Sequence, residues 1–574
     1  MPSRLKIISA LFFLVFIFLI ARLFVWQIIK GKVLASQARL QYQQSEKIIA
    51  PRGNILSNDK SALAARREAY LVFAYLPEME ENASRVSDLL APLFLEEEDF
   101  EGDYDEQLQS VAGRIKAQLT GKESVWIPLK HKVGPNIKEK IEDLKIKGIG
   151  FETEEKRVYP EASSAAHLLG FVGKDSDGID TGYFGLEGYY DLILSGKHGF
   201  LSRESDASGV PILLGSQQEV SAIEGVDLIT YIDKTIQHVI DDNLKKGLEK
   251  YGAVAGSVIV MDPKTGGILA QASYPSYDPL NYQDYTNELF ANPIVSNSFE
   301  PGSVFKILVM SSALDEGVVE PDTKCEVCAG PLPVDKYLIE TWNQVYRPDS
   351  NMVDVIVNSD NVGMAWVAQK LGKDKLYEHL AKFGIGQLSE VDLQGEWVPP
   401  LREKDSWNIV DVSTAGFGQG VAVTPIQMIR AASAIANDGV MLNPVVVQKL
   451  EGAGWEDEVT SNKGERVISE KAAKMITAMM VEAAKNGEAK WTHLRGFKVA
   501  GKTGTAQIPI SGHYDEEKTI ASFVGFAPAD DPKFIMLVTL REPTSSPWAS
   551  ETAAPLWYSI AKDLFLYFGI QPEN

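Results

Sequence analysis

Cysteine, histidine and positive charge are all scarce in this chain of 574 residues. A structural zinc site needs four ligands, and neither a second cysteine pair nor a histidine pair lies near Cys325 and Cys328. The H-E-x-x-H pattern of zinc hydrolases is also absent. The sequence therefore predicts no metal and no cofactor. The C-x-x-C pair is interpreted as a loop turn with two small residues, although its thiol or disulfide state stays open.

The chain also lacks the excess of lysine and arginine that phosphate binding requires. Its net charge of -22 argues against a nucleic-acid partner. With 45% apolar and 23% charged residues the composition is that of a globular protein, and no repeat of fixed period is present. A chain of this length is expected to form two or three domains.

The N-terminus contains a long apolar run. Residues 7–29 are interrupted only by Ser9, Arg22 and Gln27, and a short basic segment precedes them. Such a run can cross a bilayer and is longer than the core of a typical cleaved signal peptide. Residues 1–30 are therefore predicted to be a cytoplasmic tail and an uncleaved signal anchor. The alternative is a buried core helix, for which no partner of similar apolarity is evident.

The rest of the chain is predicted to contain two parts, a non-catalytic pedestal over residues 31–223 and a second domain over residues 224–574. In the pedestal, the acidic segment 95–107 is predicted to be a solvated surface loop. The second domain begins and ends with strands separated by many helices, which predicts an α+β fold with one antiparallel sheet. The expected elements are strands 227–232, 256–261, 268–272, 498–507, 520–527 and 534–540, a helix 233–250 capped by Asp233, and a closing helix 549–568.

The first candidate catalytic motif is Ser303-Val304-Phe305-Lys306, which follows Pro301-Gly302 and precedes an apolar run. This context predicts the first turn of a helix, on which residues three apart are neighbours. A serine nucleophile needs an adjacent base, and a lysine can be that base where burial and nearby positive charge favour its neutral form. The pattern is weak alone, since it also begins at Ser3, Ser57 and Ser559, where surface or turn positions explain it.

The second motif is Ser359-Asp360-Asn361. Its hydroxyl could relay a proton to a leaving amine, and its amide could bind a peptide group of a substrate. A helix cap is the alternative, because all three residue types are favoured there. Ser406-Trp407-Asn408 fits the same bare pattern, so this motif is also weak alone.

The third motif is Lys502-Thr503-Gly504-Thr505, on a predicted strand. Gly504 would leave room for the backbone of a ligand at the strand edge. Lys502 and the hydroxyls could hold a carboxylate, and a backbone N–H could face an oxyanion. A second K-T-G, at residues 264–266, lies in the predicted hairpin turn and is assigned a structural role.

These three motifs, on a helix start, a loop and a strand in that order, form the set shared by penicillin-binding proteins and class A β-lactamases. From about Glu224 onward the chain resembles the transpeptidase domain of class B penicillin-binding proteins. The likeness includes GSVIVMDPKTGGILAQASYPSYDP, FEPGSVFK, DLQGE, FGQGVAVTPIQM and SFVGFAPADDP. The N-terminal half resembles the pedestal of the same class through PRGNI, RVYP, AAHLLGFVG, GLEGYYD and LSGKHG.

The resemblance implies a penicillin-binding/serine β-lactamase-like fold, with helices on both faces of a five-stranded antiparallel sheet. It implies a peptidoglycan D,D-transpeptidase that cross-links stem peptides, releases terminal D-Ala and is acylated by β-lactam antibiotics. The implied roles are Ser303 as nucleophile, Lys306 as base, Ser359 in proton transfer, Asn361 on the substrate backbone, Lys502, Thr503, Gly504 and Thr505 in substrate binding, and the N–H groups of Ser303 and Thr505 as the oxyanion hole.

The chain departs from the family pattern at two places. PRGNI is followed by LSNDKSALA instead of an Asp-Arg-Asn-Gly-like turn, which puts partner contacts there in doubt. Val304 replaces the usual threonine and is expected to pack without affecting chemistry. Alternative functions are a D,D-carboxypeptidase, a β-lactamase, and a non-catalytic scaffold or β-lactam sensor.

The resemblance also implies partners and a location. No glycosyltransferase domain fits within the pedestal, so glycan polymerisation requires a partner, by analogy a polytopic membrane polymerase with divisome or elongation-complex proteins. The catalytic domain is expected on the outer face of the cytoplasmic membrane. The sequence leans toward the division-type enzymes and leaves stem-peptide composition and oligomeric state open.

Overall fold

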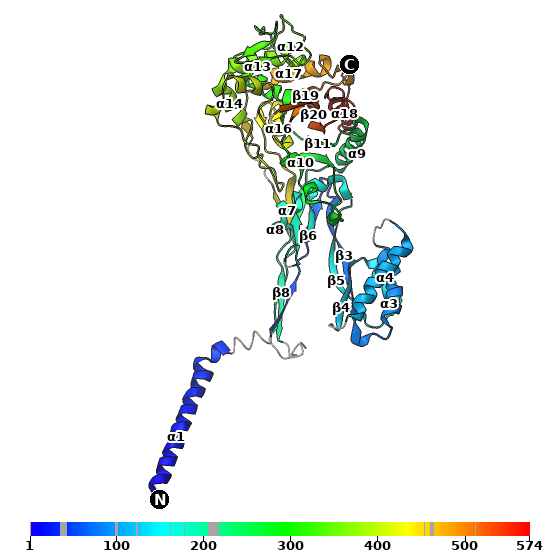
Figure 1. Ribbon diagram of the computed structural model, residues 1–574, viewed down its shortest axis with the longest axis vertical. Helices are drawn as coiled ribbons and strands as arrows, with labels where there is room; N and C mark the ends of the chain where they lie inside the picture. Colours follow the sequence, from blue (N-terminus) through cyan, green and yellow to red (C-terminus); the bar gives the residue numbers. More distant parts are fainter. Residues whose placement is uncertain are drawn as a thin grey trace. The chain divides into compact units, whose positions relative to one another are not determined.

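The computed structural model describes residues 2–34, 43–97, 102–121, 124–160, 162–176, 178–204, 217–452, 454–459, 464–510 and 513–573 (Figure 1). The chain divides into two compact units. One comprises Met1–Arg52 and Ser195–Gly225, and the other comprises Gly53–Leu194 and Val226–Asn574. The second unit contains all three candidate motifs.

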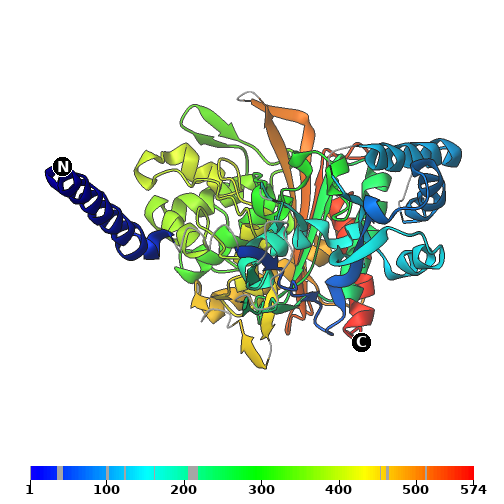
Figure 2. The ribbon, with the colours of Figure 1, turned by 90° about the horizontal axis from the view of Figure 1, so that it is seen from below.

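The first unit begins with a long apolar helix. Helix α1 (Pro2–Phe24) continues into the π-helical turn η1 (Val25–Ile29), and Figure 2 shows it in dark blue. The stretch Ser3–Ile29 is long and apolar enough to cross a membrane. Its 27 residues rise roughly 40 Å at 1.5 Å per residue, more than the hydrocarbon core of a bilayer. The helix is therefore compatible with a single-pass anchor.

The same unit contains a small antiparallel sheet. Its strand order is β1 (Gln43–Ile48), β8 (Gly199–Glu204) and β9 (Gln217–Val220). Segments from both ends of the predicted pedestal thus pair with each other.

The pedestal part of the second unit shares a seven-stranded sheet with the C-terminal part. Helices α3 (Ala83–Leu95), α4 (Tyr104–Thr120) and α5 (Pro135–Asp143) pack against this sheet, and Figure 1 shows α3 and α4 side by side. A cluster of buried apolar side chains that includes Val72, Leu90 and Ile115 joins them. The strands are β2 (Ile55–Leu56), β3 (Ala62–Tyr75), β4 (Trp126–Val133), β5 (Ile149–Val158), β10 (Asp227–Thr230), β16 (Val447–Gly452) and β17 (Trp455–Glu458).

The prediction of a solvated loop over residues 95–107 is wrong at its C-terminal end. Helix α4 begins at Tyr104, and the Asp103 side chain accepts hydrogen bonds from the N–H groups of Asp105 and Glu106. Acidic residues are favoured in a first helical turn because they interact with the positive end of the helix dipole. The acidic run therefore marks the start of a helix. Residues 98–101 lie outside the described residues.

The C-terminal part of the second unit contains the predicted five-stranded antiparallel sheet. Its order is β12 (Ile268–Tyr274), β11 (Ala255–Met261), β21 (Phe534–Arg541), β20 (His513–Ala527) and β19 (Ala500–Ile510). Successive residues of a strand face opposite sides. Accordingly, Val258 and Val260 belong to one hydrophobic cluster, whereas Ile259 and Met261 belong to another. Helices cover both faces, which confirms the predicted fold class.

Helices α9 (Lys234–Tyr251) and α18 (Ala553–Tyr567) pack together on one face of this sheet (Figure 1). The Asp233 side chain accepts bonds from the N–H groups of Thr235 and Ile236, so the predicted cap is confirmed. The opposite face carries α11 (Lys306–Asp315), α13 (Asn361–Leu371), α16 (Pro425–Ala436) and α17 (Glu470–Asn486).

The remaining elements are shorter. The helices are η2 (Leu76–Glu78), η3 (Ala162–Ala165), α6 (Ala166–Leu169), α7 (Gly185–Tyr189), α8 (Asp191–Leu194), η4 (Tyr282–Asp284), η5 (Asn287–Leu289), α10 (Pro293–Ser296), η6 (Gly302–Phe305), α12 (Met352–Val357), α14 (Lys373–Lys382), η7 (Lys404–Ser406), α15 (Ile409–Ala415) and η8 (Lys490–Thr492). The strands are β6 (Phe171–Lys174), β7 (Asp180–Tyr183), β13 (Leu332–Val334), β14 (Tyr337–Ile339), β15 (Val440–Met441) and β18 (Glu465–Arg466).

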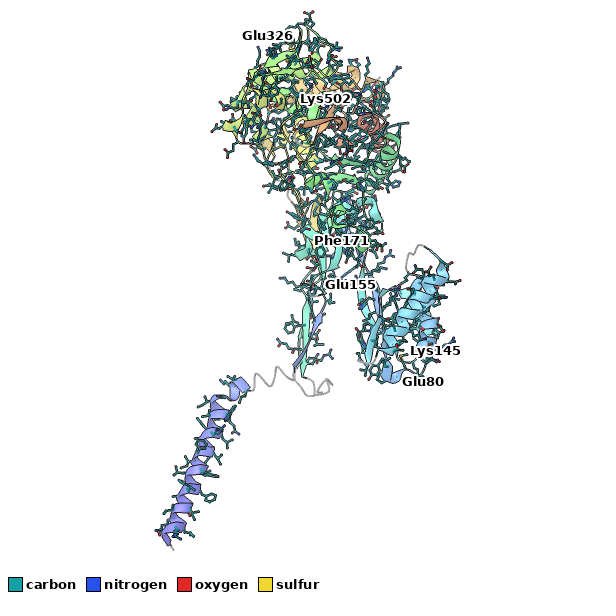
Figure 3. All side chains as sticks on the ribbon, in the orientation of Figure 1. Glu80, Lys145, Glu155, Phe171, Glu326 and Lys502 are labelled. Atoms are coloured by element: carbon teal, nitrogen blue, oxygen red, sulfur yellow. A yellow bond between two sulfur atoms is a disulfide. The ribbon has the colours of Figure 1, made fainter. Side chains whose placement is uncertain are left out.

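Buried charged groups join the sequence motifs of the pedestal. Arg157 of RVYP donates from Nε to Glu187 Oε1 of GLEGYYD at 2.7 Å and from Nη1 to the Gly53 carbonyl of PRGNI at 2.6 Å. The side chains of Arg157 and Glu187 are 7% and 0% exposed. Figure 3 marks Glu155, two residues before Arg157 on the same strand β5. Three motifs far apart in the sequence thus meet at one ion pair.

A second connection joins the pedestal to the C-terminal part of the same unit. Asp392 of DLQGE accepts hydrogen bonds from the Tyr190 hydroxyl at 2.9 Å and from the N–H groups of Val446 and Val447. Gln394 of the same motif accepts a bond from the Phe184 N–H at 2.7 Å. Burial raises the pKa of the Asp392 carboxyl, and these hydrogen bonds oppose that effect. The DLQGE segment therefore joins the C-terminal part of this unit to its pedestal part.

Candidate active site

The candidate nucleophile lies just before a buried helix. Ser303 is in the 3-10 turn η6, and Lys306 is the first residue of α11. The expected placement at the start of a helix is correct, although the turn that carries Ser303 is 3-10. Ser303 is partly exposed, whereas Lys306 is 0% exposed. The nucleophile is thus open to a substrate, and its candidate base is shielded from water.

Lys306 contacts two residues of the second motif. Its Nζ donates to the Ser359 carbonyl at 2.6 Å and to Asn361 Oδ1 at 2.7 Å, and it lies 3.3 Å from Ser359 Oγ. Ser359 has a positive φ of 54°, a conformation that most residues avoid. The structure therefore brings the first two motifs into direct contact.

The second motif is also a helix cap. Asp360 accepts from the N–H groups of Val362 and Gly363 at the start of α13. The helix cap is therefore confirmed for Asp360, while its two neighbours contact Lys306 and are free of that capping role.

Strand β19 brings the third motif to the same point. Lys502, marked in Figure 3, is 3% exposed and donates to Ser359 Oγ at 2.9 Å. It also contacts the Thr503 carbonyl at 3.1 Å and Thr503 Oγ1 at 3.2 Å. Ser359 Oγ is therefore within reach of both amines, those of Lys306 and Lys502.

The two threonine hydroxyls of this motif have partners within the protein. Thr503 Oγ1 donates to Glu488 Oε2 at 2.9 Å. Thr505 Oγ1 accepts from the Ala549 N–H at 3.0 Å. A substrate carboxylate would have to share or displace these contacts.

The absence of a side chain at Gly504 has a reason within the packing of the protein itself. A Cβ there would lie 2.8 Å from Val304 Cγ1, 2.7 Å from Ser522 Oγ and 3.0 Å from the Pro301 carbonyl oxygen. Those distances are too short for a real side chain. Gly504 thus allows the turn that carries the nucleophile to approach strand β19, which brings Ser303 near Thr505. Val304 is completely buried, as expected for a packing residue.

The surroundings of the two lysines favour a neutral amine at Lys306. Burial, reinforced by the positive charge of Lys502, lowers the pKa of Lys306 to about 7. Burial also lowers the pKa of Lys502, and the negative charge of Glu488 opposes this shift. A lysine with such a pKa can accept a proton from a nearby hydroxyl near neutral pH.

A cleft of about 210 Å³ opens at these residues. It brings together predicted residues from all three motifs with residues that the motif search did not single out. Phe417 and Gln419 belong to a segment noted for its resemblance, whereas the indoles of Trp342 and Trp548, 5.2 Å apart, had no sequence signal. The lining residues are Gly302, Ser303, Trp342, Ser359, Asn361, Phe417, Gln419, Glu488, Thr505, Ala506, Trp548, Ser550 and Glu551.

The other copies of the motifs have structural roles. Lys60 pairs with Glu451 at 2.8 Å, and the Ser559 hydroxyl contacts Asn243 at 2.8 Å. Asn408 caps α15, and Lys264-Thr265-Gly266 lies in the turn between β11 and β12. These findings confirm that Ser303, Ser359 and Lys502 are the copies that belong together.

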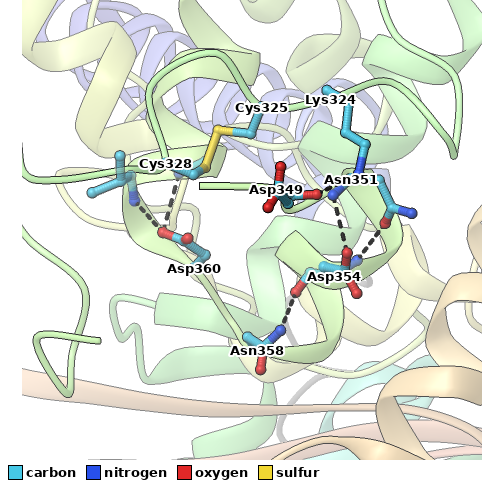
Figure 4. The surroundings of a disulfide bond; sticks show 10 residues. Lys324, Cys325, Cys328, Asp349, Asn351, Asp354, Asn358 and Asp360 are labelled. Carbon is cyan, nitrogen blue, oxygen red and sulfur yellow. Dashed lines mark hydrogen bonds between the residues drawn. A yellow bond between two sulfur atoms is a disulfide. The ribbon is translucent and has the colours of Figure 1, made fainter. Parts of the chain in front are cut away.

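The two cysteines form a disulfide rather than a simple turn of small residues (Figure 4). Cys325 and Cys328 are 4% and 0% exposed. The Cys325 N–H donates to the Ser350 carbonyl, and the Cys328 carbonyl accepts from the Arg347 N–H. A Cβ on Gly363 of α13 would lie 3.2 Å from Cys328 Sγ. The disulfide thus packs against the helix that follows Ser359-Asp360-Asn361.

Replacing both Cys325 and Cys328 with serine is expected to destabilise the chain by about 2 kcal/mol, the entropy of closing so short a loop. The acylation rate should change less than the stability, because neither cysteine lines the cleft. Urea denaturation and labelling with fluorescent penicillin would measure the two effects. An unchanged midpoint of unfolding would contradict a stabilising role.

Residues 256–565 match the penicillin-binding protein transpeptidase domain, and residues 47–230 match the penicillin-binding protein dimerisation domain. The chain belongs to the class B penicillin-binding proteins. Its two matched regions occur in the order that the resemblance implied.

Similar proteins support this assignment along the whole chain. Stage V sporulation protein D of Bacillus subtilis is 30% identical over 585 residues, which cover 100% of this chain and 87% of that protein. Peptidoglycan D,D-transpeptidase FtsI of Buchnera aphidicola is 30% identical over 472 residues, covering 81% and 79%. The crystal structure of a peptidoglycan synthetase from Bifidobacterium adolescentis has a TM-score of 0.72 at 26% identity, covering 93% and 98%.

Another solved structure contains an antibiotic. Penicillin binding protein 3 from Mycobacterium tuberculosis, complexed with aztreonam, has a TM-score of 0.70 at 25% identity and covers 92% of this chain and 98% of that chain. Binding of β-lactams is thus a property of this fold family.

Proposed function

We propose that this chain is a peptidoglycan D,D-transpeptidase that works through an acyl-enzyme on Ser303. The observation that carries the proposal is that Ser303, Ser359 and Asn361 line one cleft, while the amines of Lys306 and Lys502 both contact Ser359. An activated serine requires a base within reach and a third group that orients the base. Lys306 follows Ser303 by one helical turn and is the proposed base, and Ser359 and Asn361 hold its amine.

In the first half-reaction, Ser303 Oγ attacks the carbonyl carbon of the penultimate D-Ala in a stem peptide. Its proton passes to the neutral amine of Lys306. The N–H groups of Ser303 and Thr505 stabilise the oxyanion. The peptide C–N bond then breaks. The Ser359 hydroxyl gives its proton to the leaving amine and takes up the proton held by Lys306, so terminal D-Ala departs and an ester remains on Ser303.

In the second half-reaction, the amine of a neighbouring stem attacks the ester. A new amide bond forms, the C–O bond to Ser303 breaks, and the serine recovers a proton. Asn361 binds the substrate backbone, while Lys502, Thr503, Gly504 and Thr505 form the wall that receives the terminal carboxylate. A β-lactam would acylate Ser303 by opening its ring, and the acyl-enzyme would persist.

The pH dependence of acylation follows from the pKa of Lys306, about 7. Since the neutral amine is the base, the rate constant for acylation by benzylpenicillin should rise as the pH rises through this value. At pH 6 the rate is expected to be about tenfold below the plateau. Stopped-flow measurements between pH 5.5 and 9 would test this, with a return to pH 8 as the control for stability. A flat profile would contradict the assigned base.

Product analysis separates the alternatives. The chain is incubated with a stem pentapeptide, with and without an amine acceptor. Transpeptidation gives the cross-linked peptide only with acceptor, whereas a carboxypeptidase releases D-Ala to water in both cases. Rapid, sustained hydrolysis of a chromogenic cephalosporin would indicate a β-lactamase. Failure of fluorescent penicillin to label the chain, while a related enzyme is labelled, would indicate a scaffold.

The proposal extends to the cellular arrangement. Residues 1–30 anchor the chain in the cytoplasmic membrane, residues 31–223 form a pedestal, and the catalytic domain over residues 224–574 faces outward. A polytopic glycan polymerase supplies the strands that are cross-linked, together with divisome or elongation-complex proteins. Resemblance to division-type relatives favours a septal role, and the position of a fluorescent fusion at the septum or the side wall would test it.

A further inference from the structure

A carboxylate stands at the end of the hydrogen-bond chain that joins the two active-site lysines. Glu488 follows helix α17 and lines the cleft. Its Oε2 accepts from Thr503 Oγ1 at 2.9 Å, and Thr503 Oγ1 lies 3.2 Å from Lys502 Nζ. The chain of contacts runs on from Lys502 through Ser359 Oγ to Lys306. Glu488 is therefore connected to the candidate base without touching it.

The direction of the Thr503 hydroxyl determines what Lys502 must be. A threonine hydroxyl has one hydrogen, and here it points to Glu488, a carboxylate that can only accept. The oxygen of Thr503 therefore presents lone pairs to Lys502. With the Thr503 carbonyl and Ser359 Oγ, Lys502 Nζ has three acceptors within 3.2 Å. Three acceptors match the three hydrogens of a charged ammonium.

Lys306 has a different set of neighbours. Two acceptors, the Ser359 carbonyl and Asn361 Oδ1, are close at 2.6 and 2.7 Å, and the third contact, Ser359 Oγ, is longer at 3.3 Å. Two close acceptors match the two hydrogens of a neutral amine, whose lone pair can then take a proton. The longer third contact of Lys306 thus favours the neutral amine there, and the three contacts of Lys502 favour the ammonium.

The charged groups near these amines are Lys306 on α11, Lys502 on β19, Asp360 at the start of α13, and Glu488. The Asp360 carboxylate faces the helix N–H groups of Val362 and Gly363. Within the part of the chain that the structure describes, Glu488 is the carboxylate bonded into the chain of contacts. Two adjacent buried ammonium groups would be unfavourable, so a nearby negative charge helps one of them to persist.

We propose that Glu488 is a positioning residue that orients the Thr503 hydroxyl and keeps Lys502 as the charged lysine, leaving Lys306 as the neutral base. This inference rests on the proposed transpeptidase function. It gives Thr503 a role within the resting enzyme in addition to contact with the carboxylate of a substrate.

The effect of its charge on Lys306 provides the test. Burial and the charge of Lys502 lower the pKa of Lys306 to about 7, and Glu488 opposes both. In the variant Glu488→Gln the opposing charge is gone, so the pKa should fall further. The acid limb of the rate of acylation by benzylpenicillin should then move down by about 0.5–1 pH unit. The plateau rate should fall as well, because a neutral amide holds the Thr503 hydroxyl and the Lys502 ammonium in place less firmly than a carboxylate does.

The experiment compares four full-length proteins in detergent by stopped-flow acylation between pH 5 and 9. In Glu488→Asp the charge is kept but the bond to Thr503 is weakened, so the acid limb should stay near that of the wild type. Glu482→Gln makes the same change of net charge on helix α17. The Glu482 carboxylate accepts a hydrogen bond from the Asn486 side chain and does not line the cleft, so this variant should leave the profile unchanged. Circular dichroism checks that each variant is folded.

A midpoint of Glu488→Gln at lower pH, with Glu488→Asp near the wild type, supports the proposal. A midpoint that stays within 0.2 pH unit of the wild type or moves to higher pH overturns it. If benzylpenicillin does not acylate Ser303 of the wild type, the proposed function fails, whereas a reactive wild type with an unmoved Glu488→Gln profile removes only the role of Glu488.

Discussion

Replacing Ser303 with alanine is expected to reduce transpeptidation and β-lactam acylation by at least about 10⁴-fold. The hydroxyl forms the covalent bond in both reactions, and no neighbouring group can replace it. Ser359 Oγ lies within reach of both lysines. Yet Ser359 is only 2% exposed, whereas Ser303 is the partly exposed serine on η6 beside strand β19. Intact-mass analysis after treatment with benzylpenicillin would show no adduct on Ser303→Ala.

The chain supplies a matched control for this experiment. Ser559 begins the same S-x-x-K pattern on helix α18 and is exposed. Its hydroxyl contacts Asn243, and it lies outside the residues that line the cleft. Ser559→Ala should therefore be acylated at the rate of the wild type. An adduct on Ser303→Ala, or its mapping to a peptide without residue 303 in the wild type, would contradict the mechanism.

The sequence predicted which residues meet at this site better than it predicted how they pack. Ser303, Ser359 and Lys502 were identified because their residue types, order and expected elements agree with one reaction, and they meet in the structure. The reason for Gly504 was not predictable. Its missing side chain makes room for Val304, a contact between segments about two hundred residues apart that no local pattern encodes.

Other features depended on backbone geometry or on isolated residues. The positive φ of Ser359 could not be predicted from the sequence, because serine rarely adopts this conformation. Glu488 and Trp342 belong to no recognisable motif, so only the folded chain shows that they line the cleft. Strand β20 begins at His513, earlier than expected, because the polar residues before Ile520 lack the alternation that reveals a half-buried strand.

Replacing Arg157 with methionine is expected to destabilise the chain by about 3–5 kcal/mol. The substitution leaves the Glu187 carboxylate, 0% exposed, without its guanidinium. It also removes the bond to the Gly53 carbonyl, so the contacts between three pedestal segments are lost together. This loss is a large part of the stability of a typical domain. Urea denaturation of the full-length chain in detergent, followed by tryptophan fluorescence, would measure the shift in midpoint.

Two further variants separate a buried charge from a surface charge. Glu155 lies on the same sheet and pairs with Arg66 at 3.8 Å, where both side chains are about one-third or more exposed. Glu155→Gln should therefore cost less than about 1 kcal/mol. The double variant Arg157→Met, Glu187→Leu should recover most of the lost stability, since an apolar pair of similar volume needs no counter-charge. If Arg157→Met cost no more than Glu155→Gln, the buried pair would not be what holds PRGNI, RVYP and GLEGYYD together.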